Sequence, residues 1–138
     1  MPKALLYRWF GLGKMPASLR SQAELEGIVF FDEGIRCVLT YRDFHRPGVR
    51  SMLERRLFIG AITLTNVRLL AVSGNNKFVD VPRSDERLKK MQFTVEDNSF
   101  VIRFDASLFH SDWSGSIEYK YKTDDAQRLL DLLRPHLA

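Results

Sequence analysis

The sequence predicts a mainly β protein, a curled antiparallel sheet of about seven or eight strands followed by one C-terminal helix. Three observations predict this fold class. Apolar and polar side chains alternate at period two in several runs between residues 28 and 121, which is typical of half-buried strands. Short turn signals separate these runs and favour antiparallel pairing, because parallel strands need long crossovers. The last segment instead repeats its apolar residues at helical spacing.

Length and composition fit a single domain. The 138 residues are enough to bury a sizeable core. No run approaches the roughly 18 apolar residues of a membrane-spanning helix, and we expect no signal peptide at the start of the sequence. Cys37 is the only cysteine, which excludes a disulfide within the chain and a cysteine-rich metal site. We therefore expect a reducing, cytoplasmic setting, with attachment to a membrane surface as an addition to it.

We divide the chain into an N-terminal arm with a short helix, residues 1–26, and a β domain, residues 27–138. The arm is unusually apolar, and an exposed patch of this kind marks a contact surface on a soluble protein. Packing against the domain or a second subunit is one interpretation, an interfacial membrane anchor is another, and disorder is a third. The candidate contact residues are Leu5, Leu6, Trp9 and Phe10.

The first elements are read from helix formers and turn residues. Good helix formers at 16–26, followed by Gly27, predict a short helix. Strands are predicted at 28–31 and 35–42, separated by an Asp-Glu-Gly turn at 32–34. Pro47 and Gly48 place residues 44–48 in a loop, and residues 50–54 complete the connection to the next strand.

The most regular strand pattern lies at 57–72. Ile62 and Leu64 alternate with threonines, Asn66 marks a tight turn, and the alternation resumes after it. Residues 57–61 are apolar at almost every position, so we expect this strand to be central and covered on both faces.

The remaining elements follow the same signals. Further strands are predicted at 78–81, 91–96, 100–105 and 117–121, with turns at 73–76 and 97–98. We expect Phe109 and Trp113 to fold the loop at 106–114 back over the open end of the sheet. Thr123 or Asp124, with Gln127, predicts a capping box for the last helix. Its apolar face consists of Ala126, Leu129, Leu130, Leu133 and Leu137.

Two segments carry a family resemblance. The sequence GAITLTNVRLLAV at 60–72 is similar to a hairpin motif of GRAM-type and bacterial pleckstrin-homology-like (PH-like) domains, and TDDAQRLLDLLRP at 123–135 resembles their C-terminal helix. The resemblance spans about 27–137 as topology. It implies a split antiparallel β-barrel capped by the helix, and a binding scaffold rather than an enzyme. In PH domains that hold phosphoinositides, basic residues flank the first hairpin turn. We place that turn at the acidic residues 32–34, which argues against such a ligand.

An arginine-rich segment is the main candidate for a binding site. Residues 36–68 contain seven arginines, no lysine, and Asp43 and Glu54 as the only acids. Guanidinium groups bind phosphate or carboxylate through paired hydrogen bonds, so an anionic partner is one interpretation and a solvated loop is the other. The predicted anion-binding residues are Arg42, His45, Arg46, Arg50, Arg55 and Arg56.

Signals for catalysis and cofactors are weak throughout. The serines lie in no nucleophile elbow, and Gly11 to Gly13 is only a Gly-x-Gly without a preceding strand. Asp105, His110 and Asp112 match no metal-binding spacing. We therefore expect no cofactor, no metal and no catalytic residue. An enzyme stays open only if folding brings His45 or His110 beside a carboxylate in a deep pocket.

The resulting functional hypothesis is a non-catalytic binding module. Its partner would be another protein or a second copy of the chain, recognised through sheet edges and the apolar arm. The alternative is attachment to an anionic membrane or a phosphate-bearing ligand through the arginine-rich segment. We rank nucleic acid behind these partners, because a curled sheet uses most of its aromatic residues for the core.

Overall fold

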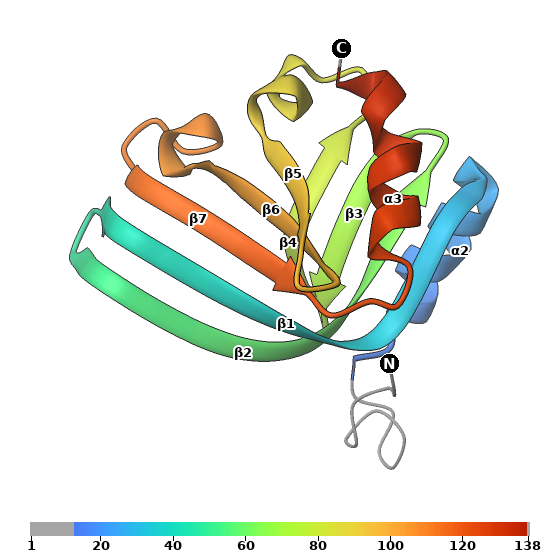
Figure 1. Ribbon diagram of the computed structural model, residues 1–138, viewed down its shortest axis with the longest axis horizontal. Coiled ribbons are helices and arrows are strands. Elements are labelled where there is room, and N and C mark those ends of the chain that lie inside the picture. Colours follow the sequence, from blue (N-terminus) through green and yellow to red (C-terminus); the bar gives the residue numbers. More distant parts are fainter. Residues whose placement is uncertain (1–12, 138) are drawn as a thin grey trace.

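In a computed structural model that describes residues 13–137, the chain forms one seven-stranded antiparallel sheet with a helix on either side (Figure 1). The strand order is β4-β3-β2-β1-β7-β6-β5, so β1 joins a four-strand meander to a three-strand meander. The mainly β fold class with a short N-terminal and a C-terminal helix is confirmed. The strands are β1 (Ile28–Arg46), β2 (Val49–Thr65), β3 (Arg68–Ser73), β4 (Asn76–Pro82), β5 (Gln92–Glu96), β6 (Ser99–Asp105) and β7 (Ser114–Tyr121). The helices are α2 (Ala17–Glu26) and α3 (Ala126–Leu133), with 3-10 turns η1 (Glu86–Lys90), η2 (Ala106–Leu108) and η3 (Arg134–His136).

The first strand is continuous, and the predicted turn at 32–34 is wrong. Residues 28–46 form one strand, and the register with β2 shifts between Glu33 and Ile35. Gly34 takes a positive φ of 67° at this shift, so the glycine forms a bulge rather than a reversal of the chain. A turn signal and a bulge signal use the same residue type, because both need a backbone that tolerates positive φ.

The predicted loop at 44–54 is also wrong. Only Pro47 and Gly48 leave the ladder, where Gly48 has a φ of 79°, and β2 begins at Val49. The first hairpin turn is therefore flanked by His45, Arg46 and Arg50, and not by acidic residues. The expected contrast with phosphoinositide-binding domains fails for the same reason, because it placed the first turn at residues 32–34.

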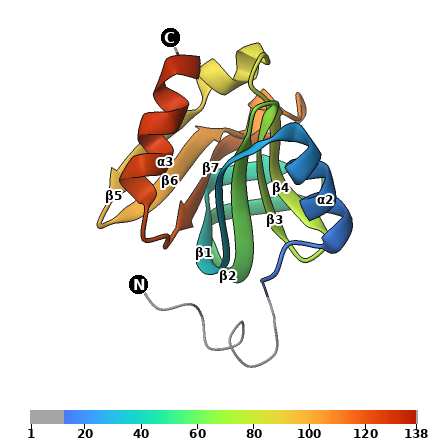
Figure 2. The same cartoon turned by 90° about the vertical axis from the view of Figure 1, so that its right-hand side faces the viewer.

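The predicted hairpin at Thr65 and Asn66 is confirmed, because β2 ends at Thr65 and β3 begins at Arg68. Burial on both faces starts at Gly60 rather than at Leu57, which is 81% exposed. One face of β2 and β3 packs on Met15 and on Leu19 of α2. The other face packs on α3. Figure 2 shows the two helices on opposite sides of these strands.

The later elements match the predicted pattern closely. The β5–β6 turn uses Asp97 and Asn98, which both adopt positive φ, as a two-residue hairpin requires. On α3, four of the five predicted apolar residues are buried, namely Ala126, Leu129, Leu130 and Leu133. The residue at the start of the helix is Asp125, and its side chain makes no capping hydrogen bond. Thr123 instead donates a hydrogen bond to Asp32, 2.6 Å away, and ties the helix entrance to β1.

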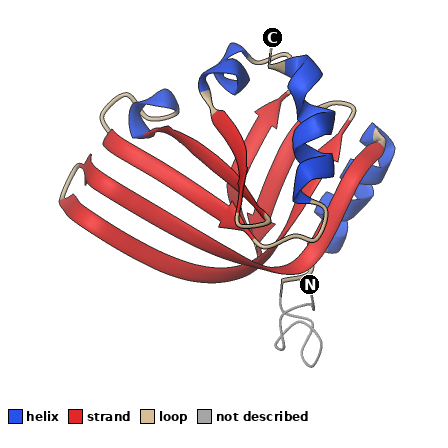
Figure 3. Ribbon diagram, viewed as in Figure 1, coloured by secondary structure: helices blue, strands red, loops and turns tan. Residues whose placement is uncertain are grey.

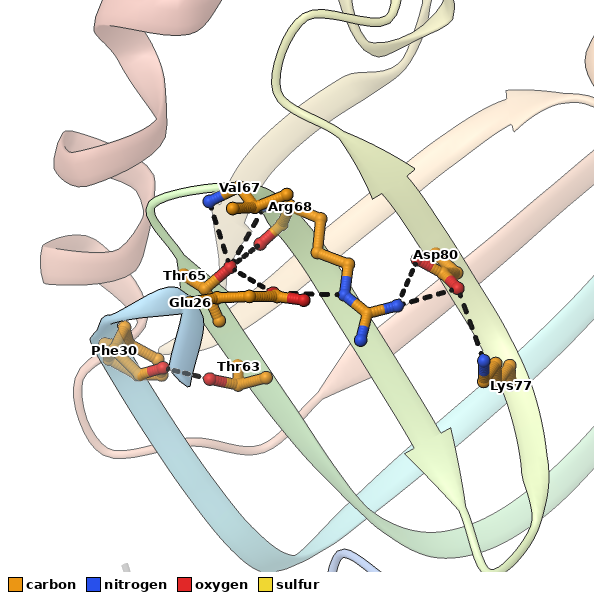
Figure 4. A network of polar contacts seen from close by, with 8 residues as sticks. All are labelled: Glu26, Phe30, Thr63, Thr65, Val67, Arg68, Lys77 and Asp80. Atoms are coloured by element: carbon orange, nitrogen blue, oxygen red, sulfur yellow. Dashed lines mark hydrogen bonds and ion pairs between the residues drawn. The ribbon is translucent and has the colours of Figure 1, made fainter. Parts of the chain in front are cut away.

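A buried polar network fixes α2 to the sheet (Figure 4). Arg68 on β3 donates to Glu26 at the end of α2 over 3.2 Å, and to both carboxylate oxygens of Asp80 on β4 over 3.0 and 3.1 Å. Thr65 donates to the same carboxylate of Glu26 over 2.8 Å. The Arg68 side chain is only 9% exposed, so it is a structural tie between three elements and not a free cation.

Candidate functional site

The distal part of β2 is a free sheet edge. On one side, Val49 to Phe58 pairs with β1 along its whole length. On the other side, β3 pairs only with Ala61 to Leu64, and the Ser73 hydroxyl donates to the Ile59 carbonyl over 3.0 Å where the strands separate. Within residues 13–137, no strand covers the edge from Val49 to Phe58. Alternate N–H and C=O groups there point away from the sheet and can pair with another strand.

This edge also carries exposed apolar side chains. Met52 is 81% exposed, Leu53 60% and Leu57 81%. Figure 3 shows that no α-helix lies over this distal part of the β1–β2 hairpin. Long, apolar, uncovered edges are rare on proteins that stay monomeric, because they are templates for association. This edge is therefore a candidate contact surface.

The six predicted anion-binding residues do not form one cluster. Arg42 and Arg55 share one face of the sheet, because Thr40 lies opposite Arg55 and both line the same hollow as Arg42. Arg56 lies on the other face, where its guanidinium is 5.9 Å from the centre of the Tyr41 ring. His45, Arg46 and Arg50 stand exposed at the hairpin turn, with His45 directly opposite Arg50.

The structure adds cations that the local sequence did not indicate. Residues of β6 and β7 join the face that carries Arg42 and Arg55, around a shallow hollow of about 360 Å³. We call this surface the basic face. Its cations are Arg36, Arg42, Arg55, Arg103, Lys120 and Lys122. The exposed residues Leu53 and Leu57 lie on the same face, because they are opposite Arg42 and Val38.

Part of this positive charge is neutralised. The carboxylate of Glu118, only 8% exposed, accepts hydrogen bonds from Arg103 over 2.6 Å and from Arg42 over 3.2 Å. Arg103 also binds Glu96 over 2.7 Å. Among the described residues, Arg36, Arg55 and Lys122 have no ion pair. These three cations are therefore the part of the basic face that is available to an external anion.

The pKa values on the basic face follow from these contacts. The hydrogen bonds from Arg103, with a smaller one from Thr94, hold the pKa of Glu96 below its ordinary value. The same contacts with Glu96 and Glu118 raise the pKa of the Arg103 guanidinium. Both groups therefore remain charged across the physiological range, and the pair forms a fixed part of the surface.

The other predicted residues either lie in the core or at the surface, or precede the described residues. Leu5, Leu6, Trp9 and Phe10 precede residue 13. Cys37 is 1% exposed, and burial raises the pKa of its thiol to about 12, so it is a neutral core residue. His45 and His110 make no hydrogen bond or ion pair with a carboxylate of residues 13–137. His110 stacks on Trp113 with ring centres 3.8 Å apart.

Residues 13–137 hold neither a metal-binding cluster nor a membrane span. No group of three or more His, Cys, Asp or Glu side chains among them is placed to hold a metal ion. None of the described helices combines the length and the apolar character that a membrane crossing needs.

Models of protein families, curated proteins and solved structures were compared with the chain. None of the three comparisons finds a match. The site is therefore interpreted from its own geometry.

Sequence reasoning missed the free edge and the long-range half of the basic face. The edge had one usable signal, the apolar residues Met52, Leu53 and Leu57 inside an otherwise charged segment. Pro47 and Gly48 instead favoured a loop for most of that segment. The basic face had no local signal, because Lys120 lies opposite Val38 only through the β1–β7 register.

Proposed function

We propose that the protein is a PH-like, non-catalytic binding module that associates through the free edge of β2, with a second copy of the chain as the partner. The observation that carries this proposal is the unpaired edge from Val49 to Phe58 with its exposed apolar side chains. Strand addition at such an edge supplies backbone hydrogen bonds, and the side chains on either face supply specificity. The PH-like part is supported by the two meanders and by the packing of α3.

Symmetry restricts how two copies can pair. Two identical edges meet antiparallel across a two-fold axis perpendicular to the sheet, and this axis keeps every side chain on its own face. Residues that lie opposite each other must then both be odd or both be even in number. With the axis at Arg55, Leu53 lies opposite Leu57 of the partner, and Glu54 lies opposite Arg56. Both kinds of contact occur twice in the dimer.

This register fits the chemistry of both faces. Leu53 and Leu57 would cover each other on the basic face, while Met52 would lie opposite Phe58 on the other face. Glu54 is the only acid between Val49 and Phe58, and it would face an arginine rather than another acid. One unfavourable contact remains, because the two copies of Arg55 meet at the axis.

That arrangement predicts opposite effects for two neighbouring substitutions. Glu54→Arg would place arginine opposite arginine twice, and should weaken dimer formation about tenfold or more. Arg55→Gln would remove the like-charge contact at the axis and should tighten the dimer. Sedimentation equilibrium over a range of protein concentrations measures both. Glu86→Arg makes the same charge change at an exposed residue of η1 and should leave the dimer unchanged.

A chain that stays monomeric at the highest soluble concentration would reject the second copy as partner. Equal weakening of the dimer by Glu54→Arg and by Glu86→Arg would reject the free edge of β2 as the interface, because the weakening would then follow from net charge alone.

A second candidate is peripheral attachment to an anionic membrane. The observation that favours it is the basic face, where unpaired Arg55 and Lys122 lie with exposed Leu53 and Leu57. Cations beside apolar side chains are the features that bind a surface at the lipid headgroups.

Vesicle sedimentation tests this candidate. Binding should require phosphatidylserine in the vesicles, weaken as salt rises, and fall with Arg55→Glu plus Lys122→Glu. Lys89→Glu plus Lys90→Glu on η1 is the control with the same charge change. Equal binding to pure phosphatidylcholine, or equal loss in the control, would exclude this function.

A further inference from the structure

A candidate for a second site lies on the face of the sheet opposite the basic face. A cavity of about 200 Å³ opens between the β3–β4 hairpin and the η2 loop, and aromatic side chains form most of its lining. Its floor consists of Phe104, Ile117 and Tyr119, which are at most 8% exposed. Its walls are half-buried rings from β1, β4 and the η2 loop, chiefly Tyr41, Phe78 and Trp113. No acidic residue lines the cavity.

The rings hold one another in place around the opening. Phe78 stacks on Tyr119 with centres 5.4 Å apart, and Phe104 meets Phe109 edge to face at 5.3 Å. Trp113 packs edge to face against the buried Phe44 at 5.4 Å. These contacts fix the orientation of the rings, so the cavity offers both ring faces and ring edges to a flat ligand.

Cations surround the aromatic lining. The Arg46 guanidinium lies 5.8 Å from the centre of the Trp113 ring, and Arg56 and Arg87 stand in the same way over Tyr41 and Phe109. Arg56 and Arg87 are already paired with carboxylates, at 2.9 and 2.6 Å. Arg46 has no such partner among the described residues. Lys77 lines the cavity itself and holds Asp80 only loosely, at 3.6 Å.

The volume of the cavity restricts which ligands can fit. At the packing density of a protein interior, about 200 Å³ holds about ten non-hydrogen atoms. That is one ring or a small fused ring system, and it is too small for the acyl chain of a lipid. From the aromatic walls, the missing acid and the cations at the rim, we infer that this cavity binds a small aromatic anion. The ring would lie among Tyr41, Phe78 and Trp113, and the acidic group would point to Arg46 and Lys77.

The inference is independent of dimer formation and can be tested on the full chain. Trp9→Phe leaves Trp113 as the only tryptophan, so its indole N–H signal in the NMR spectrum of the protein reports on the cavity alone. The probes are 2-naphthoate, its neutral analogue 2-naphthalenemethanol, and N-acetyltryptophanamide, which stands in for the side chain of a protein partner. We expect saturable binding of one 2-naphthoate per chain, about tenfold tighter than that of the neutral analogue. Amide and methyl NMR shifts should move at Ile117 and Phe78.

Two variants separate the apolar and the charged part of the site. Arg46→Gln plus Lys77→Gln changes exposed side chains, so the fold should persist while the preference for the anion is lost. Ala106→Phe places a ring in the cavity and should abolish binding of both naphthalene probes. Arg36→Gln plus Lys122→Gln on the basic face removes the same charge, serves as the matched control and should change neither. Circular dichroism verifies that each variant is folded.

Three results would overturn the inference. The first is the absence of saturable 2-naphthoate binding to the Trp9→Phe chain. The second is equal affinity for the anion and its neutral analogue, because the cations then play no part. The third is tighter binding of N-acetyltryptophanamide than of 2-naphthoate, because the cavity then accepts a protein side chain. The double variant tests the role of the cations even if Ala106→Phe does not fold.

Discussion

Among single residues, Arg68 connects three elements of the fold. Its guanidinium forms ion pairs with α2 and β4 at once, through Glu26 and Asp80, and one of its nitrogens is buried without a partner among residues 13–137. The sequence showed Thr65 and Arg68 as parts of one motif, but it did not show what they bind. The partners come from positions 42 and 12 residues away, and no local pattern encodes that distance.

Removing this arginine should be costly. Arg68→Met keeps the length of the side chain but leaves the buried carboxylate of Glu26 without its cation, and we expect the free energy of unfolding to fall by about 3 kcal/mol. Urea denaturation measures this change. Arg134→Met removes an exposed pair with Asp131 and should cost less than about 0.5 kcal/mol. Equal effects of the two substitutions would contradict the structural role of Arg68.

At the scale of elements, prediction succeeded where the strands are buried. The β2–β3 and β5–β6 hairpins show apolar residues at alternate positions, and the β5–β6 turn uses Asp97 and Asn98, which both have positive φ. Prediction failed in the distal β1–β2 hairpin for the opposite reason. Residues 49–57 of β2 are mostly exposed on both faces, so no alternation marks them as a strand. Their partner is β1, and pairing is not visible in composition.

Gly60 allows the end of β3 to lie close against β2. A Cβ at this position would lie 2.3 Å from the Val72 carbonyl oxygen, which is a backbone atom and cannot easily move. We therefore expect Gly60→Ala to lower the free energy of unfolding by about 2 kcal/mol. Gly48→Ala, in open space at the hairpin turn, should cost about 1 kcal/mol through its positive φ alone. Thermal unfolding of both variants checks the order, and a larger loss for Gly48→Ala would contradict this account.

The whole molecule is built on one sheet, whose two faces differ and whose two edge strands are β4 and β5. Core residues from β1, β6, β7 and α3 fill the inside of the curl, and α2 covers a second, smaller core. The general fold could be predicted because it follows from alternation and from one amphipathic helix. The candidate surfaces could not, since the aromatic cavity gathers residues between positions 41 and 119 through the strand register. Only the cationic residues of the first hairpin were visible in the sequence.

The N-terminal arm is predicted to take part in association, which is a property of the whole molecule. The described chain begins at Gly13, whose carbonyl accepts a hydrogen bond from Gly34 and which lies against Ile59, beside the free edge of β2. If Leu5 to Phe10 contribute to association, deleting residues 1–11 should raise the dimer dissociation constant about tenfold, since apolar contact area is lost. Light scattering at several concentrations measures it. An unchanged dissociation constant would remove the arm from the interface.

The place of β1 in the sheet also bears on how the chain reaches its native state. This strand pairs on one side with its neighbour in sequence, but from Cys37 to Arg42 its other side pairs with β7, near the opposite end of the described chain. The first four strands can assemble as soon as they have been synthesised, whereas the second ladder of β1 must wait for the last strand. Pairing over such a sequence separation slows folding, because the entropy of a long loop is lost before the ladder stabilises the chain. During translation, the nascent meander would therefore expose the open side of β1 until β7 has been synthesised.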